Sequence, residues 1–197
     1  MTAYALLRIR FTHYWLSGSG ASGGRYADAV ALRDADGFPA MPMSQIKGTL
    51  RETAERLAAG GQAGWNPALV TRLFGYRPRM GETAAPPKDG QGALRFPGQA
   101  RLPTKDRNPD RKPDLFQPLA ATRIDKYGVA DNMTLRAVEA AKPLILEGRV
   151  EWNADFPEPA DTYWPELIDA ACAATLAFGK LKTDGYGRAV AWLEVPQ

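Results

Sequence analysis

Apolar and polar residues alternate in several stretches of the chain, and this period of two predicts half-buried strands. In residues 7–11, LRIRF, large apolar side chains alternate with arginines. The alternation returns in residues 29–33 and then runs into an Asp-Gly turn and a proline. LILEGRVEW at residues 144–152 and AVAWLEV at residues 189–195 are also typical of strands. The pattern therefore predicts four strands, spread over the whole chain.

Two further stretches follow the helical period. In PMSQIKGTLRETAERLAAG, apolar residues recur three or four positions apart, at Ile46, Leu50, Ala54 and Leu57. Ser44 is the candidate N-cap of this helix, and Gly60 can close it. WPELIDAACAATLAF, residues 164–178, predicts a second helix that is apolar enough to lie on a sheet. This order of elements predicts an α+β fold, with helices packed on an antiparallel sheet.

Composition narrows the class of protein. The 197 residues suffice for one domain with a buried core. Cys172 is the only cysteine and stands in an alanine-rich run, so a disulfide framework and a multi-cysteine metal site are excluded. The chain has no basic and apolar leader and no run of about 20 apolar residues, which a membrane span requires. We therefore expect a soluble, cytoplasmic protein without membrane contact.

Positive charge gathers in the middle of the chain, although the net charge is only +3. Residues 101–126 hold seven Lys or Arg against four Asp, and four prolines interrupt them. Because proline at this density cannot lie inside a helix or a central strand, we expect an extended loop or a hairpin arm. Residues 77–98 also resemble a loop. Basic residues on such an arm suit phosphate contacts, but a solvated linker has the same composition.

SGSGASGG, residues 17–24, contains the G-x-G-x-x-G spacing of dinucleotide-binding turns, at Gly18, Gly20 and Gly23. Such a turn requires a helix directly after the glycines. The alternating residues 29–33 follow instead, which argues against a nucleotide-dependent enzyme. Two interpretations stay open: a flexible Gly/Ser loop, or a main-chain surface for the phosphates of a polynucleotide.

A second glycine-rich segment, FGKLKTDGYGRA at residues 178–189, precedes the last predicted strand. Its glycines would let the main chain approach a ligand closely. Three cations and an aromatic side chain accompany them, at Lys180, Lys182, Tyr186 and Arg188. A tight turn explains one or two of the glycines but not the cations, so RNA or another polyanion is the better interpretation.

The chain contains, in this order, DAVALRDADGFPAMPMSQIKGTLR, LFGY, TRIDKYGVADNMTLRAVE and FGKLKTDGYGR. Together these four segments resemble the CRISPR-associated RAMP superfamily. DAVALRDADGFPAMPMSQIKGTLR is similar to its strand, turn and helix, and LFGY to the short element that follows that helix. TRIDKYGVADNMTLRAVE resembles the end of the thumb hairpin in the backbone subunits of type III effector complexes. FGKLKTDGYGR is similar to the C-terminal glycine-rich loop of the superfamily. The helix start has Gln45-Ile46 where Ser-Leu is typical, Lys126 replaces an arginine, and Ala27 precedes Asp28.

The resemblance implies a single domain over residues 1–197, in which residues 76–134 form an irregular insertion and a thumb. It implies an RRM-like (ferredoxin-like) antiparallel sheet with packed helices, plus a thumb hairpin and long loop insertions. The implied partners are CRISPR guide RNA, target RNA, further copies of the chain or homologous RAMP subunits, and large and small effector subunits. The residues implied to bind RNA supply main-chain groups, hydroxyls and cations: Gly18, Gly20, Ser44, Lys47, Gly48, Arg51, Arg123, Lys126, Gly179, Lys180, Lys182, Gly185, Tyr186, Gly187 and Arg188.

Catalysis, in this family pattern, depends on one carboxylate. Counting back five residues from Arg33, as the resemblance suggests, reaches Asp28. Asp28 would then act in target RNA cleavage and would bind Mg²⁺ or Mn²⁺, because a divalent ion is required there. Two alternatives remain: a guide RNA scaffold without chemistry, and a metal-free endoribonuclease that processes precursor CRISPR RNA with His13 as base. His13 is expected on the first strand, where a structural role is more typical.

Overall fold

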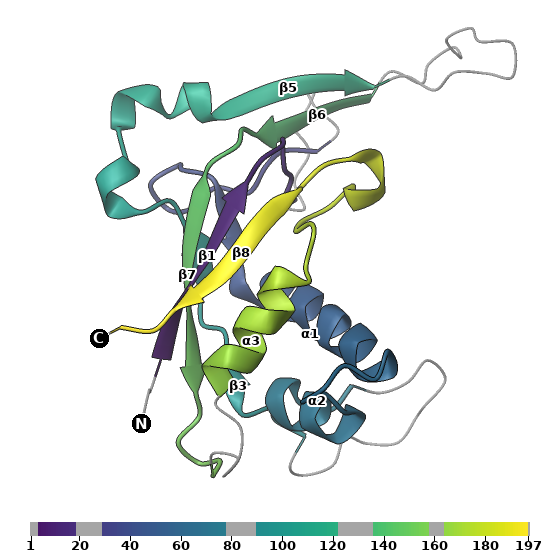
Figure 1. Cartoon of the computed structure of the whole chain (residues 1–197). Coiled ribbons are helices and arrows are strands. Elements are labelled where there is room, and N and C mark those ends of the chain that lie inside the picture. Colours follow the sequence, from purple (N-terminus) through teal and green to yellow (C-terminus); the bar gives the residue numbers. More distant parts are fainter. Residues whose placement is uncertain (1–3, 19–28, 78–89, 122–135, 158–163, 197) are drawn as a thin grey trace, which may run out of the picture.

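The computed structural model describes residues 4–18, 29–77, 90–121, 136–157 and 164–196, shown in colour in Figure 1. The central sheet of this part of the chain is antiparallel and six-stranded. Its strands are β1 (Tyr4–Phe11), β2 (Ala40–Pro42), β3 (Leu94–Arg95), β4 (Gln99–Arg101), β7 (Ile145–Trp152) and β8 (Ala189–Glu194). Their order is β2-β4-β7-β1-β8, with β3 paired to β7. β5 (Phe116–Ala121) and β6 (Arg136–Ala141) form a separate two-stranded sheet.

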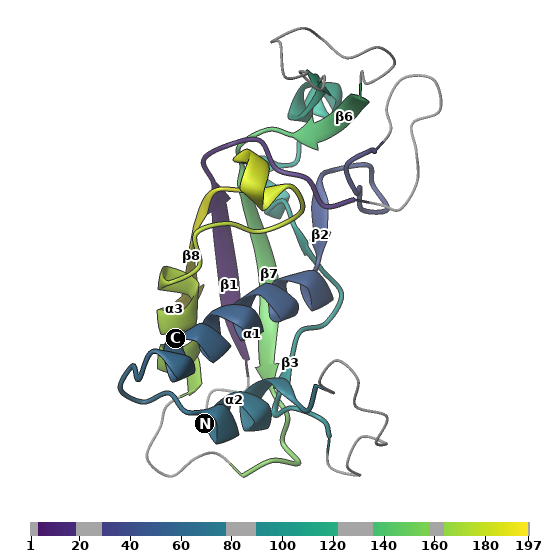
Figure 2. The ribbon, with the colours of Figure 1, turned by 90° about the vertical axis from the view of Figure 1, so that its right-hand side faces the viewer.

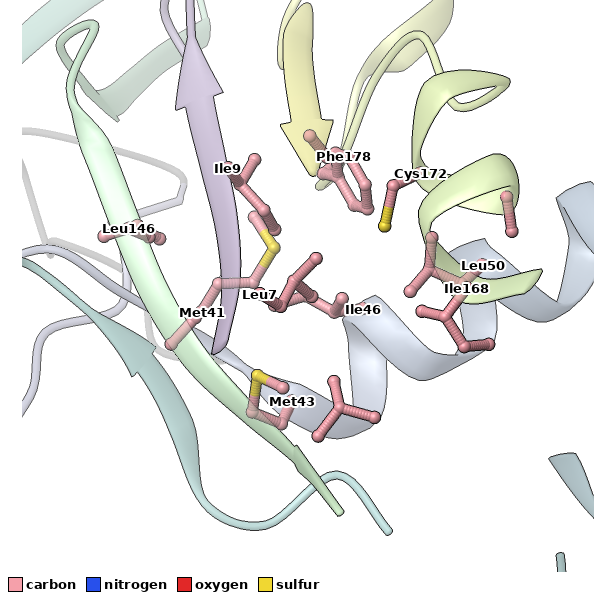
Figure 3. Close-up of a cluster of buried hydrophobic side chains, with 14 of the residues drawn as sticks. Leu7, Ile9, Met41, Met43, Ile46, Leu50, Leu146, Ile168, Cys172 and Phe178 are labelled. Carbon is pink, nitrogen blue, oxygen red and sulfur yellow. The ribbon is translucent and has the colours of Figure 1, made fainter. Parts of the chain in front are cut away.

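Three helices lie on one side of the central sheet (Figure 2). They are α1 (Met43–Ala59), α2 (Pro67–Phe74) and α3 (Trp164–Ala173). The alternation in β1 turns Leu7 and Ile9 toward the helices, where both are fully buried (Figure 3). Ile46 of α1 and Ile168 of α3 complete this layer. The α+β class is therefore confirmed.

Cys172 lies inside this core (Figure 3). Burial raises the pKa of its thiol far above the ordinary range, because a thiolate would lose its solvation there. The side chain therefore serves as a small apolar group.

Several local predictions differ from the structure. Ser44 is not the N-cap, because β2 leads straight into α1 and the helix begins at Met43, whose N–H donates to Gly98 O at 3.0 Å. The end of the helix at Gly60 is confirmed. Residues 29–33 form isolated bridges to different partners in place of a continuous strand. β3 lies in the stretch predicted as a loop, and β4 was not predicted; β5 pairs with β6, as the hairpin-arm alternative for residues 101–126 allows.

β5 and β6 extend from one end of the central sheet (Figure 1). The main chain of Trp15 exchanges two hydrogen bonds with Ala141, at 3.0 and 2.8 Å. Arg33 donates to both carboxylate oxygens of Glu139, at 2.8 and 3.1 Å, and its guanidinium lies 3.8 Å from the ring centre of Phe116. We call the β5–β6 pair the hairpin and its end at Phe116 and Ala141 the base. The base is thus fixed to the segments that follow β1 and precede β2.

The segment that leads from β4 to β5 has an anchor of its own. Asp34, whose side chain is 1% exposed, accepts Nη2 of Arg107 at 2.6 Å. Arg107 also donates to Asp36 at 2.9 Å and to the carbonyl oxygen of Leu102 at 3.0 Å. The same Asp34 carboxylate accepts two main-chain N–H groups of its own turn. A buried ion pair with such complete hydrogen bonding is costly to break from one side.

Arg107→Ala should lower the free energy of unfolding by about 3 kcal/mol, because the Asp34 carboxylate would remain buried without its cation. Urea denaturation measures the difference. Arg111→Ala is the matched control, since Arg111 is exposed in the same segment and should change stability by less than about 0.5 kcal/mol. Equal stability of the two variants would contradict the claim that Arg107 and Asp34 anchor the segment between β4 and β5.

Candidate nucleic-acid interface

Three segments that are distant in sequence meet beside the central sheet: residues 12–18 after β1, residues 43–52 at the start of α1, and residues 178–188 before β8. We call them the loop–helix surface. The N–H of Lys180 donates to Leu16 O at 2.7 Å, and the N–H of Gly187 donates to Tyr14 O at 2.8 Å. Ser17, fully buried, donates its hydroxyl to Gln45 Oε1 at 2.8 Å. The structure thus brings Ser17 and Gly18, the start of the first glycine-rich segment, together with residues 178–188 and the basic helix.

The glycines of the 178–188 segment are required by the chain itself. Gly179 has φ +101°, and a Cβ there would lie 2.6 Å from the carbonyl oxygen of Leu16. Gly187 has φ +75°, and a Cβ there would lie 2.0 Å from the carbonyl oxygen of Phe178. The protein's own backbone occupies the space of a Cβ at both positions, so the fold requires these two glycines, and their contact with RNA stays a prediction. Gly185, at φ +87°, has nothing within 4 Å of such a Cβ.

The cations of this segment project around the folded loop. Lys180 and Arg188 are exposed. The Lys180 ammonium lies against Gly18, where an added Cβ would be 2.6 Å from Nζ. Lys182 Nζ lies 3.8 Å from the Glu52 carboxylate of α1, which ties the loop to the helix. Tyr186 is partly buried.

Along α1, four of the residues predicted to bind RNA line one hollow of about 390 Å³: Ser44, Lys47, Gly48 and Arg51. Lys47 donates to Leu94 O at 3.2 Å, and burial lowers the pKa of its ammonium, with the positive charge of Arg51 lowering it further. Arg51 pairs with Glu55 at 2.8 Å. Gly48 is exposed with open space around it, so a ligand can reach the helix backbone there.

Two residues of the same hollow, Phe74 and Arg77, were missed by the sequence analysis. Phe74 ends α2, a helix that was not predicted although it carries a clear start signal. The side chain of Asn66 accepts the N–H of Leu69 at 2.9 Å, and Pro67 is the first helical residue. Asn-Pro before an apolar run could have revealed this helix and the position of Arg77 after it.

A family model, that of the RAMP superfamily, matches residues 8–190. The chain belongs to the RAMP superfamily. Among solved structures, it is similar to a chain in the cryo-EM structure of the Type III-B Cmr-beta bound to cognate target RNA, with a TM-score of 0.66. The two chains are 11% identical, and the similarity covers 98% of each, which shows a shared fold. No curated protein matches the chain.

Several predicted site residues of this RAMP chain cannot be located. Gly20, Asp28, Arg123 and Lys126 lie outside the described residues. The residue after Asp28 is described, and Ala29 O accepts the N–H of Glu139 at 2.9 Å. In the part of the chain that the structure describes, no three His, Cys, Asp or Glu side chains gather to hold a metal ion.

His13 does not lie on the first strand, because β1 ends at Phe11. It is exposed in the following bend, and its Nδ1 lies 3.0 Å from Thr12 Oγ1. None of the helices in the described ranges of this RAMP chain is long and apolar enough to cross a membrane.

Proposed function

We propose that this RAMP chain is a CRISPR RNA-binding backbone subunit of a type III-like effector complex, and that it cleaves bound target RNA through Asp28. One observation carries the proposal: two segments that contain both glycines and cations, residues 43–52 and 178–188, meet on the loop–helix surface. The ion pair of Lys182 with Glu52 joins them. Phosphate contacts come largely from lysine and arginine side chains, and this surface gathers Lys47, Lys180 and Lys182. The similarity to a chain of an RNA-bound type III-B assembly supports the same assignment.

In this proposal the central sheet with its helices is the RRM-like palm, and β5 and β6 form the base of the thumb. The arginine contacts at residues 33 and 107 then hold the thumb at a fixed angle to the palm. Copies of the chain, or homologous subunits, would stack along the guide, each binding a short stretch of its backbone. Large and small effector subunits would complete the complex. Cleavage would require Mg²⁺ or Mn²⁺, whereas guide RNA binding would not.

Lys47→Ala and Lys182→Ala should each weaken guide RNA binding and flatten its salt dependence. Each phosphate contact releases counterions, so one lost contact lowers the slope of log affinity against log salt by about 0.7 for single strands. Fluorescence anisotropy with guide RNA at several salt concentrations measures both quantities. Lys105→Ala is the matched control, because this lysine is exposed in the turn Thr104–Asp106 between β4 and β5 and does not belong to the loop–helix surface. Unchanged affinity and salt slope in both test variants would contradict RNA binding by the loop–helix surface.

A further inference from the structure

Leu181 has an unusual backbone conformation. Its φ of 56° and ψ of 32° are left-handed, and no other non-glycine residue in the described ranges has a positive φ. This conformation is unfavourable for a residue with a Cβ, and such outliers concentrate at functional sites. The leucine side chain is also exposed, at 37%.

Backbone hydrogen bonds explain why residue 181 is left-handed, but they do not explain why this residue is a leucine. Leu181 O accepts the N–H groups of Asp184 and Tyr186, at 3.0 and 3.3 Å, and these bonds close the short 3₁₀ turn Lys182–Asp184. Glycine would adopt the same conformation without strain, as Gly179 and Gly185 do in the same loop. A leucine at this position therefore exposes apolar surface and strains the backbone, and neither benefits the fold.

The surroundings of Leu181 indicate what this side chain would contact. Exposed lysines precede and follow it, at 180 and 182. Tyr14, itself 37% exposed, is hydrogen-bonded to the same loop through Gly187. Cations beside exposed apolar and aromatic side chains suit a ligand that carries both phosphates and flat apolar faces, which describes single-stranded nucleic acid.

We propose that Leu181 packs against the face of an RNA base while Lys180 and Lys182 contact the phosphates on either side. The contact is independent of base identity, because every base has an apolar face. It also explains why a strained leucine stands where glycine would fit. This inference rests on the proposed RNA-binding function and adds to it a residue that recognises bases.

The test compares Leu181→Gly with wild type on two probes, a 12-nucleotide oligouridylate and the same strand with abasic riboses in place of uridines. Leu181→Gly should bind oligouridylate about fivefold more weakly, with an unchanged salt slope, because the phosphate contacts persist. On the abasic strand, the two proteins should bind equally. The thermal midpoint of Leu181→Gly should equal or exceed that of wild type, since the strain is relieved. Leu181→Met should retain wild-type affinity for oligouridylate.

The outcomes separate this inference from the function on which it rests. If Lys182→Ala weakens RNA binding but Leu181→Gly does not, the base contact is wrong and the RNA-binding surface stands. If Leu181→Gly binds oligouridylate normally but loses association with further copies on guide RNA, the side chain contacts protein and the inference is also wrong. If wild type binds neither probe nor guide RNA, the proposed function fails and the inference falls with it.

Discussion

Asp28→Ala should abolish target RNA cleavage by the assembled complex while guide RNA binding stays nearly unchanged. Removing an acid from a phosphate-binding surface cannot reduce its attraction for phosphate, so a pure loss of chemistry is the expected result. General acid–base assistance contributes about 10²- to 10⁴-fold to a rate, and the loss should be of that size. The measurement is single-turnover cleavage of labelled target RNA in Mg²⁺ or Mn²⁺, with guide affinity determined in parallel.

The expected chemistry is an in-line attack of a ribose 2′-hydroxyl on the adjacent phosphate. The Asp28 carboxylate would take the hydroxyl proton or hold a hydrated cation in place. As the 2′-oxygen bonds to phosphorus, the bond from phosphorus to the 5′-oxygen breaks, and the leaving 5′-oxygen takes a proton from water. One product would end in a 2′,3′-cyclic phosphate and the other in a 5′-hydroxyl. A divalent cation, when bound, supplies charge stabilisation at the phosphate. His13→Ala should have little effect, because this proposal assigns the chemistry to Asp28 and gives His13 no part in it.

The other outcomes identify the alternatives. Wild-type complexes that bind target RNA without cutting it in either metal would be guide RNA scaffolds. Cleavage that persists in a chelator and requires His13 would instead indicate precursor processing.

The chain directly after Asp28 has a defined position. Ala29 O accepts the N–H of Glu139 of β6, and the Glu139 side chain is held by Arg33. Ala29, the residue that follows Asp28 in the sequence, is therefore attached to β6.

The sequence predicted the long elements of the fold because their periodicity extends over many residues. β1, β7, β8 and α1 lie where alternation or helical spacing placed them, and α3 begins at the predicted Trp164 but ends at Ala173, before the predicted Phe178. β2, β3 and β4 have two or three residues each, too few to show a period. Their pairing depends on distant partners, such as Ala100 opposite Met41, and no local pattern records it.

The residue types of the candidate site could be predicted from the sequence, but the tertiary contacts that shape it could not. Glycines and cations at residues 178–188 indicated a phosphate-binding loop. That Gly179 and Gly187 contact Leu16 and Phe178 could not be predicted, since these approaches follow from tertiary packing. Leu181 escaped notice for the same reason, because a left-handed leucine has no sequence signature.

Gly187→Ala should be among the most damaging single substitutions on the loop–helix surface. The added Cβ would meet the carbonyl oxygen of Phe178 at 2.0 Å, and φ +75° is itself unfavourable for alanine. Both main-chain groups of Gly187 are also engaged, with Tyr14 O and with the N–H of Phe178. The loop would have to rearrange.

We therefore expect the free energy of unfolding in urea to fall by about 2–4 kcal/mol in Gly187→Ala. RNA affinity, measured where the variant is still folded, should also fall. The reason is that the loop that positions Lys180, Lys182 and Arg188 would change its shape. Gly185→Ala is the matched control: it has a similar φ of +87° but open space around the new Cβ, so only about 1 kcal/mol of backbone strain is expected. Equal losses in the two variants would show that the contact with Phe178 does not determine the shape of the loop.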